Sequence, residues 1–390
     1  MGSSGIFTYP GIERVVYGEP AAEAVRREAE RLDAGRVFCL VSGTLDRTTD
    51  EIARLRAALG GRFAGQFDRM PPHTPRDAVI AAAGAARAAG ADLLVTFGGG
   101  SLTDAGKMVQ ICLRHDIRRA DDLEPFHQRL DADGRPSFPT FAPPLVRQIA
   151  VPTTLSGGEF NANAGCTNPV SKIKEMYRNP LLVPKVVILD PAVTVHTPGW
   201  LWSATGIRAV DHCIETLCSI RPTPFSDAHA LESLRLLAAG LPRVHADPAD
   251  VEARMNCLLG AWLAMTGIAA GVPLGASHGI GHQLGSTCGV QHGHTSCILM
   301  PRVMRFNASA VPGPLARVSA ALGRPGESAA DLVAALIRRL DMPTTLGAVG
   351  VGREQFPRVV EAALQDRWVH SNPRPFKGRD DILAILDAAA

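Results

Sequence analysis

Two kinds of pattern divide the chain near Asp190. Before it, short apolar runs that predict buried strands alternate with helical patterns. The apolar runs cover residues 36–43, 92–101, 147–156 and 185–191. The helical patterns between them cover residues 21–32, 50–60 and 75–91. Beyond Asp190 only helical patterns follow. Because strands that alternate with helices are typical of a parallel sheet covered on both faces, the first half predicts an α/β fold.

The sequence therefore predicts two domains, and its 390 residues suit that number. Residues 1–190 are expected to form an α/β domain with a parallel sheet. Residues 191–390 are expected to form an all-helical domain. The segment 121–146 is rich in proline and has little periodicity, which predicts a long loop or a hairpin insertion.

Composition limits the partners of the chain. Forty Lys and Arg residues against 38 Asp and Glu give a formal charge of only +2, and 5% of residues are aromatic. This balance favours neither nucleic acid nor an anionic membrane surface. No apolar run approaches a membrane span, and the first residues lack the features of a signal peptide. The eight cysteines form no CxxC pair, which is typical of a reduced cytoplasmic protein. We expect a small-molecule substrate.

A glycine triplet predicts a phosphate-binding loop. The stretch GGGSLTDAGK, residues 98–107, follows a predicted strand and opens a predicted helix. Gly98, Gly99 and Gly100 allow the backbone to approach a ligand closely, and Ser101 lies where free N–H groups favour a pyrophosphate. Asp104 lies on the same helix as Lys107, three residues apart. A glycine-rich turn without a ligand is the alternative.

Hydroxyl side chains gather at the end of the run 147–156. Thr153, Thr154 and Ser156 occur in the stretch VPTTLSGGEF. Since ligands collect at the carboxyl ends of strands in open α/β sheets, these residues are candidate cofactor contacts. An ordinary Ser/Thr turn is the alternative.

Four of the twelve histidines fall within residues 277–297. His278 and His282 are four residues apart, so both project from one helix face. His292 follows a glycine-containing turn, and His212 lies on another predicted helix. Neutral imidazoles from separate helices are a common divalent metal site, although ordinary hydrogen bonds would also explain them. His294 is expected either behind the site or facing a substrate.

The motifs GGGSLTDAGK, VPTTLSGGE, HGIGHQLGSTCGVQHG and NPRP together resemble the iron-containing alcohol dehydrogenase family, especially its maleylacetate reductase branch. The resemblance runs nearly end to end. It implies an N-terminal dinucleotide-binding domain, a C-terminal helical domain and an active site in the cleft between them. It also implies hydride transfer with NAD or NADP, and commonly a homodimer.

The resemblance places iron or zinc ligands at His212, His278 and His292, and it places His282 beside the nicotinamide, where it could pass a proton. Metal-dependent members carry an aspartate ligand four residues before the first histidine, where this chain has Arg208. A guanidinium cannot ligate a cation, and it repels a unit charge by ~4 kcal/mol at about 4 Å for ε ≈ 20.

Maleylacetate reductases also lack that aspartate and are regarded as metal-free. We therefore expect no iron or zinc, and a catalytic set made of Arg208 and the histidines at positions 212, 278, 282 and 292. Arg208 would hold a carboxylate or phosphate of the substrate. An ion pair of Arg208 with Asp211 or Glu215 is the alternative.

The resemblance also bears on the choice of cofactor. NAD-selective members have an acidic residue after the second strand, where this chain has Gly43. NADP is then permitted, with Ser42 and Thr44 as contacts, although Asp46 and Arg47 lie near enough to reverse this preference. Lys174 matches a lysine that often approaches the cofactor in the family; an ordinary surface lysine is the alternative.

These features predict an NAD(P)H-dependent reductase of a small, anionic keto or unsaturated keto substrate. A metal-dependent alcohol dehydrogenase is the first alternative. A sugar-phosphate cyclase or lyase of the same fold is the second, and a protein that retains the fold without turnover is the third.

Overall fold

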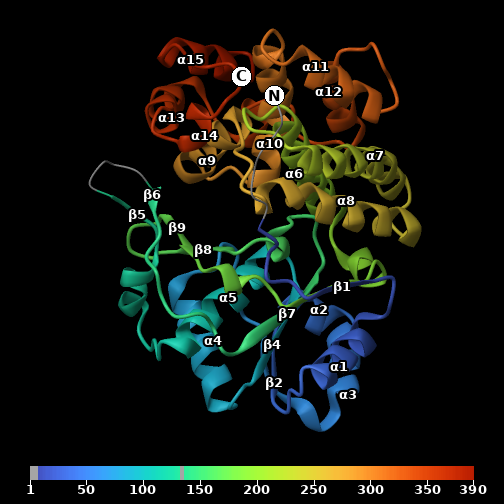
Figure 1. Cartoon of the computed structure of the whole chain (residues 1–390), viewed down its shortest axis with the longest axis vertical. Helices are drawn as coiled ribbons and strands as arrows, with labels where there is room; N and C mark the ends of the chain where they lie inside the picture. The colour runs from blue at the N-terminus through green and yellow to red at the C-terminus, as the bar shows by residue number, and fades with distance from the viewer. Residues whose placement is uncertain (1–7, 132–135) are drawn as a thin grey trace. The chain divides into compact units, whose positions relative to one another are not determined.

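The computed structural model describes residues 8–131 and 136–390, which form two compact units (Figure 1). The α/β unit contains residues 8–154 and 158–196. The helical unit contains residues 155–157 and 197–390. The chain thus passes from one unit to the other after His196, slightly beyond the predicted division at residue 190.

A six-stranded parallel sheet forms the centre of the α/β unit, which confirms the predicted fold class. Its strands lie in the order β3-β2-β4-β7-β10-β1. Their bounds are β1 Arg14–Tyr17, β2 Val37–Val41, β3 Phe63–Phe67, β4 Leu93–Gly98, β7 Arg147–Pro152 and β10 Val186–Leu189.

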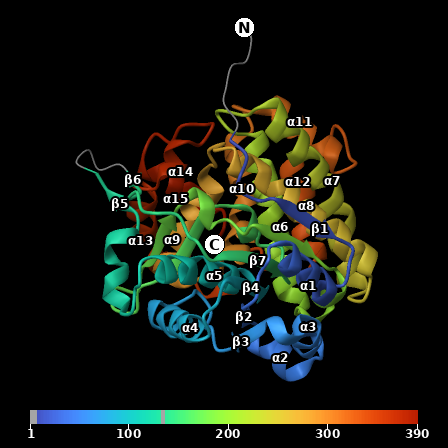
Figure 2. The same cartoon turned by 60° about the horizontal axis from the view of Figure 1, so that its bottom comes forward.

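Side chains of β2 alternate between two apolar cores, and all five residues of the strand are buried. Val37, Cys39 and Val41 join the core under α1 and α3, whereas Phe38 and Leu40 join the core under α4 and α5. Figure 2 shows these two pairs of helices on opposite sides of the sheet. The helices are α1 Ala21–Arg31, α2 Gly43–Thr48, α3 Glu51–Leu59, α4 Arg76–Ala88 and α5 Gly100–Arg114. A strand buried on both faces explains the uninterrupted apolar run in the sequence.

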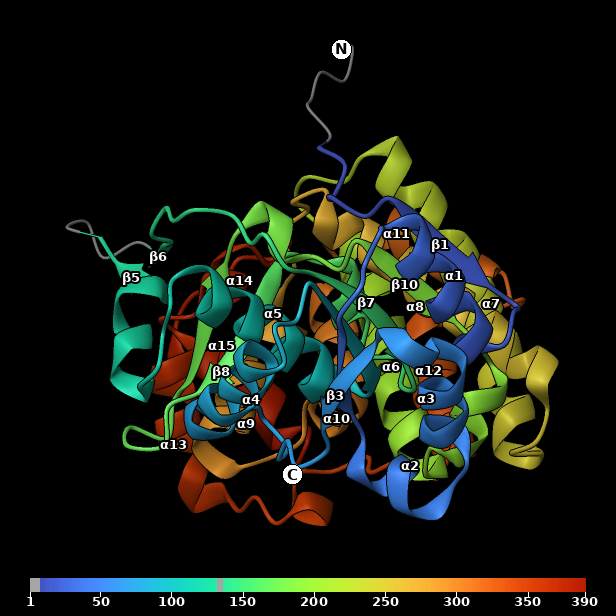
Figure 3. The same ribbon diagram turned by 90° about the horizontal axis from the view of Figure 1, so that it is seen from below.

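The strand order reverses between β2 and β4. From β2 the chain moves outward to β3, and from β3 it returns past β2 to β4 (Figure 3). The helices that follow β2 and β4 therefore cover opposite faces of the sheet. Loops that diverge at such a reversal leave a crevice at the carboxyl ends of the two strands, where ligands of open α/β sheets bind.

Two short antiparallel pairs complete the α/β unit. In the predicted insertion, β5 Arg129–Leu130 pairs with β6 Pro136–Ser137, and the turn at 132–135 lies outside the described residues. The second pair, β8 Asn163–Thr167 with β9 Lys174–Arg178, was not predicted, and neither were β1 and β3.

Helices alone make up the regular structure described beyond Asp190, as predicted, together with short 3-10 turns. Within the helical unit, α6 packs against α7, α8 and α10, and α9 packs against α10, α13 and α14. No helix among the described residues has the length and hydropathy needed to cross a membrane. The bounds are α6 Gly199–Leu217, α7 Pro224–Ala246, α8 Val251–Ala269, α9 Ala276–Cys288, α10 His292–Asn307, α11 Pro312–Ala321, α12 Ala329–Arg339, α13 Phe356–Ala363, α14 Arg367–His370 and α15 Arg379–Asp387.

Candidate active site

The glycine triplet forms the turn between β4 and α5. Gly98 has φ +154°, and a Cβ atom at this position would lie 2.3 Å from Cδ1 of Leu102. Only glycine fits such a backbone at such a contact. Gly99 is the N-cap residue of α5, and Gly100 begins the helix. Free N–H groups in this first turn, together with the helix dipole, suit a pyrophosphate.

Three strand ends meet around this turn. The amide of Ser42, after β2, donates to the carbonyl of Phe97 at 2.9 Å, and the amide of Thr153, after β7, donates to the carbonyl of Gly98 at 3.0 Å. A Cβ atom on Gly99 would lie 3.3 Å from Cγ2 of Thr154. The structure therefore brings Ser42, the glycines, Thr153 and Thr154 together where the strand order reverses.

The other predicted cofactor contacts lie in different surroundings. The hydroxyl of Ser101 accepts a hydrogen bond from the amide of His73 at 3.2 Å. Asp104, on α5, forms an ion pair at 3.6 Å with Lys174, on β9. Lys174 therefore faces the side of α5 that carries Asp104. Ser156 belongs to the helical unit.

Lys107 holds the loop that follows β7. Its ammonium group is buried and donates to the carbonyls of Gly158 and Asn163, at 2.6 Å each. Burial lowers the pKa of Lys107 to about 8, and burial raises the pKa of nearby Glu159 to about 7. Lys107 thus fixes the backbone beside the glycine turn.

The first acidic residue after β2 in the sequence is already paired. The Asp46 carboxylate is held by Arg56 at 2.6 Å and by Nε2 of Gln66 at 2.8 Å. The exposed Arg47 lies beside Gly43, with Nη1 2.8 Å from the position that a Cβ atom of Gly43 would occupy. Arg47 thus places a positive charge beside Gly43.

The helical unit brings the four predicted catalytic histidines together. The rings of His212, from α6, and His278, from α9, stack with centroids 4.9 Å apart. The centroids of His278 and His282 are 6.2 Å apart, and those of His282 and His292 are also 6.2 Å apart. We call this continuous set of rings the histidine row.

Glu215 positions His278. Nδ1 of His278 lies 2.7 Å from the Glu215 carboxylate, which also accepts the amides of Gly275 and Ser277 at 2.8 Å each. The carboxylate thus caps α9 at its positive end and fixes the plane of the imidazole. Nε2 of His278 is buried and has no hydrogen bond to any described residue.

Arg208 and Asp211 lie next to the row on α6. Nη1 of Arg208 donates to the hydroxyl of Ser296 at 2.9 Å and lies 3.8 Å from the carboxylate of Asp211. Asp211 also accepts the hydroxyl of Ser277 at 2.8 Å. The ion pair anticipated for Arg208 is therefore present with Asp211, whereas Glu215 is bonded to His278 instead.

Burial controls ionisation here. It raises the pKa values of Asp211 and Glu215 above their usual range, and the charge of Asp211 adds to the effect on Glu215. Burial, reinforced by the charge of Arg208, lowers the pKa values of His212 and His278 well below their usual value. These two imidazoles are therefore neutral at neutral pH and act as hydrogen-bonding groups rather than as acids.

His282 has a different partner. Its Nδ1 lies 3.3 Å from the carboxylate of Asp366, which also accepts from Nε2 of Gln283 at 3.1 Å and from the amide of Trp368 at 2.8 Å. The side chain of His282 is 37% exposed, so its other nitrogen can reach a ligand. Sequence reasoning missed Asp366, because 84 residues separate it from His282 and no local pattern links them.

The last two histidines of the segment differ in their surroundings. His292, at the start of α10, is exposed and is the last member of the histidine row. His294 has a ring contact with Trp200, at 6.1 Å between centroids, and burial lowers its pKa.

The buried donor atoms beside the histidine row differ from the usual ligand set of a divalent metal site. Donor atoms of Asp211, Glu215 and His278 all lie within 4.8 Å of one another and are buried. However, Glu215 already accepts two backbone amides and contacts Nδ1 of His278, and the position of the usual aspartate ligand is occupied by the cationic Arg208. The residues present do not supply the usual four-ligand set.

Comparisons with known proteins identify the family. The family description "Iron-containing alcohol dehydrogenase" matches residues 12–191, and "Fe-containing alcohol dehydrogenase family, C-terminal" matches residues 202–390. A maleylacetate reductase of Rhizobium sp. (strain MTP-10005) is 34% identical, with 96% of this chain and 95% of the relative covered.

Similar solved structures support the same family assignment. The crystal structure of maleylacetate reductase from Agrobacterium tumefaciens has a TM-score of 0.84 at 29% identity and covers 100% of this chain and 98% of its own. That of an iron-containing alcohol dehydrogenase from Corynebacterium glutamicum has a TM-score of 0.82 at 26% identity and covers 99% and 97%. These similarities confirm the predicted class, a reductase that uses a nicotinamide nucleotide. The chain belongs to the iron-containing alcohol dehydrogenase family.

Proposed function

We propose that the protein uses NADPH to reduce a small dicarboxylic, unsaturated keto acid of the maleylacetate kind, without a metal ion. The position of Arg208 is the observation on which this proposal rests. It puts a buried positive charge beside the histidine row, where metal-dependent relatives are expected to place an anionic ligand.

Arg208 suits a substrate carboxylate. Its side chain is only 11% exposed, and its two described partners, Ser296 and Asp211, both meet the same nitrogen, Nη1. The planar guanidinium has further N–H donors, which match a carboxylate in bidentate geometry. Named maleylacetate reductases among the relatives are consistent with this substrate class.

Arg208 and the histidines have different roles in the proposed reaction. When bound, the nucleotide supplies a hydride, and the substrate takes up that hydride and one proton. Arg208 holds a substrate carboxylate, and His282, in place of a metal, stabilises the oxyanion that develops as hydride arrives. His282, oriented by Asp366, delivers the proton. His212 and His278, which are neutral, complete the histidine row beside His282.

The residues that follow β2 favour NADPH over NADH as the cofactor. Gly43 presents no carboxylate to repel a 2′-phosphate, and the carboxylate of Asp46 is already held by Arg56. Arg47, beside Gly43, adds a positive charge that favours the phosphate.

A spectrophotometric screen tests the activity. NADPH and NADH are each offered with maleylacetate, other 2- and 3-oxo acids and simple aldehydes, with and without a chelator. We expect NADPH to be consumed with maleylacetate at the same rate in both conditions. Turnover of aldehydes alone, or consumption of neither nucleotide, would contradict the proposal. Net consumption also separates a reductase from a cyclase, which regenerates its nucleotide.

Substitution of Arg208 by lysine tests the carboxylate contact. Lysine keeps the charge but loses the bidentate fork, so we expect KM for the dicarboxylate to rise about tenfold or more while NADPH binding is unchanged. The matched control is Arg235→Lys, at an exposed arginine of α7 that pairs with Glu232. An unchanged KM in Arg208→Lys would remove the assigned role.

A metal-dependent alcohol dehydrogenase is the second candidate. It is favoured by Asp211, whose Oδ1 is buried without a hydrogen bond to any described residue and lies next to His278. Metal analysis of the purified protein separates the two candidates. Loss of turnover on chelation, with recovery on adding zinc or iron, would establish the second.

A further inference from the structure

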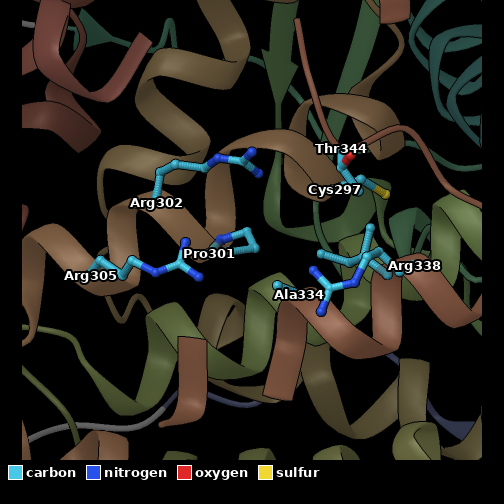
Figure 4. A pocket seen from close by; sticks show the side chains of 8 residues that line it. Cys297, Pro301, Arg302, Arg305, Ala334, Arg338 and Thr344 are labelled. Carbon is cyan, nitrogen blue, oxygen red and sulfur yellow. The ribbon is translucent and has the colours of Figure 1, made fainter. Parts of the chain in front are cut away.

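A cavity of about 130 Å³ lies between α10 and α12 in the helical unit (Figure 4). Its walls are Cys297, Pro301, Arg302 and Arg305 from α10, Ala334, Ile337 and Arg338 from α12, and Thr344. It lies outside the histidine row, since it shares no lining residue with that row. Three of its eight lining residues are arginines, an unusual density for so small a space.

The positive charges at this cavity exceed the negative ones. Within the part of the chain that the structure describes, Arg302 donates only to the backbone carbonyls of Ile298 at 2.9 Å and Ala388 at 3.2 Å. Arg305 pairs with Asp331 at 2.6 Å, and that carboxylate is exposed. Among the described residues Arg338 makes no hydrogen bond or ion pair and acts on Asp331 only through space. The exposed carboxylate of Asp331 thus interacts with two of the three guanidinium groups, those of Arg305 and Arg338.

Burial and repulsion between arginines disfavour the charged state of Arg302 at this cavity. Burial, together with the neighbouring charge of Arg305, lowers the pKa of Arg302. Burial also raises the pKa of the Cys297 thiol far above its usual range, so that this group stays neutral and adds no negative charge. A bound anion would relieve the repulsion, because it would supply the missing countercharge.

We infer that this cavity is a binding site for a compact dianion, either phosphate or a short dicarboxylate. The volume is several times the roughly 10–15 Å³ that a single water molecule needs in a cavity, which suits an anion of this size. Guanidinium N–H groups bind phosphate and carboxylate oxygens in the same forked geometry, and the Thr344 hydroxyl offers one further donor. The site differs from the proposed substrate site at Arg208.

The test measures thermal stability and binding heat of the full chain, with saturating NADPH present so that the nucleotide site is filled. Inorganic phosphate and succinate are the two probes, and sodium chloride at equal ionic strength is the reference. Arg338→Gln removes one guanidinium from the cavity and leaves the fold intact, because the side chain is exposed. Arg339→Gln is the matched control, since Arg339 is also exposed in the last turn of α12 but does not line the cavity.

We expect at least one probe to raise Tm beyond the chloride reference in the wild type and in Arg339→Gln. In Arg338→Gln the Kd for that probe should weaken about tenfold or more, since one charge-assisted contact is lost. A response to phosphate alone identifies a phosphoryl ligand, and a response to succinate alone identifies a dicarboxylate. The inference is overturned if neither probe exceeds chloride, or if Arg338→Gln responds like the wild type, which would mean that the anion binds elsewhere.

Discussion

At the scale of single residues, Glu215 determines how His278 can act. The carboxylate accepts two amides from the start of α9 and contacts Nδ1 of the imidazole. When Nδ1–H donates to Glu215, Nε2 becomes an acceptor facing the histidine row. A carboxylate 63 residues away in the sequence thus fixes the tautomer of a residue in the proposed site.

Replacing Glu215 with glutamine should therefore impair both folding and turnover. Both carboxylate oxygens accept backbone amides, so an NH2 group in either place would face another donor. We expect a loss of about 1–3 kcal/mol in the free energy of unfolding and a tenfold or greater fall in kcat, measured by urea titration and steady-state kinetics. The control Glu232→Gln, at an exposed ion pair, should cost about 0.5 kcal/mol or less. Equal effects of the two substitutions would exclude the positioning role.

Sequence patterns located much of this chemistry but not the residues that orient it. The spacing of His278 and His282 predicts a shared helix face, and the structure places their rings in one row. Glu215 was named from the sequence only as a partner for Arg208, because helical spacing shows which residues share a face but not which other helix they meet. Asp366 left no local signal, since its contact with His282 depends on the packing of α14 against α9.

At the scale of elements, the turn from β4 to α5 depends on the absence of a side chain at Gly98. In Gly98→Ala the new Cβ would collide with Leu102, and the backbone at φ +154° would be strained. We expect a loss of about 1–3 kcal/mol in stability and much weaker NADPH binding, measured by urea unfolding and by fluorescence titration.

Gly84, inside α4, is the matched control. A Cβ atom there would meet nothing within 4 Å, and alanine favours helix by roughly 0.5–1 kcal/mol over glycine. Gly84→Ala should therefore stabilise the protein and leave NADPH binding unchanged. If both alanine variants bound NADPH normally, the turn would not be the nucleotide site.

The burial of each strand explains why some strands were predictable from the sequence and others were not. The strands β2, β4, β7 and β10 are buried on both faces, so their sequences are apolar runs. The unpredicted strands β1 and β3 lie at the edges of the sheet, and most of their side chains are exposed or half-buried. An edge strand has little apolar surface to bury, and its sequence does not differ clearly from that of a loop.

At the scale of the whole molecule, buried thiols tie stability to pH. Burial raises the pKa values of seven cysteines to about 12 or beyond; they are Cys39, Cys112, Cys166, Cys213, Cys218, Cys257 and Cys297. They are distributed over both units, so no single site accounts for the effect. In the unfolded chain the same thiols lose their protons near the ordinary pKa of 9.0.

This difference predicts cooperative alkaline unfolding. Above pH 9 the unfolded state holds fewer thiol protons than the folded state, so the contribution of the thiols to stability is retained below pH 9 and lost as pH rises. Each thiol contributes a slope of about 1.4 kcal/mol per pH unit, whereas Lys107, with its pKa lowered to about 8, opposes one of them until about pH 10.5. Because a typical domain has only about 5–15 kcal/mol of stability, we expect unfolding near pH 10. Urea titrations with reductant between pH 8 and 10 measure the slope, and Cys39→Ala should reduce it by one proton. A wild-type slope that corresponds to fewer than about two protons would show that these thiols titrate in the folded state.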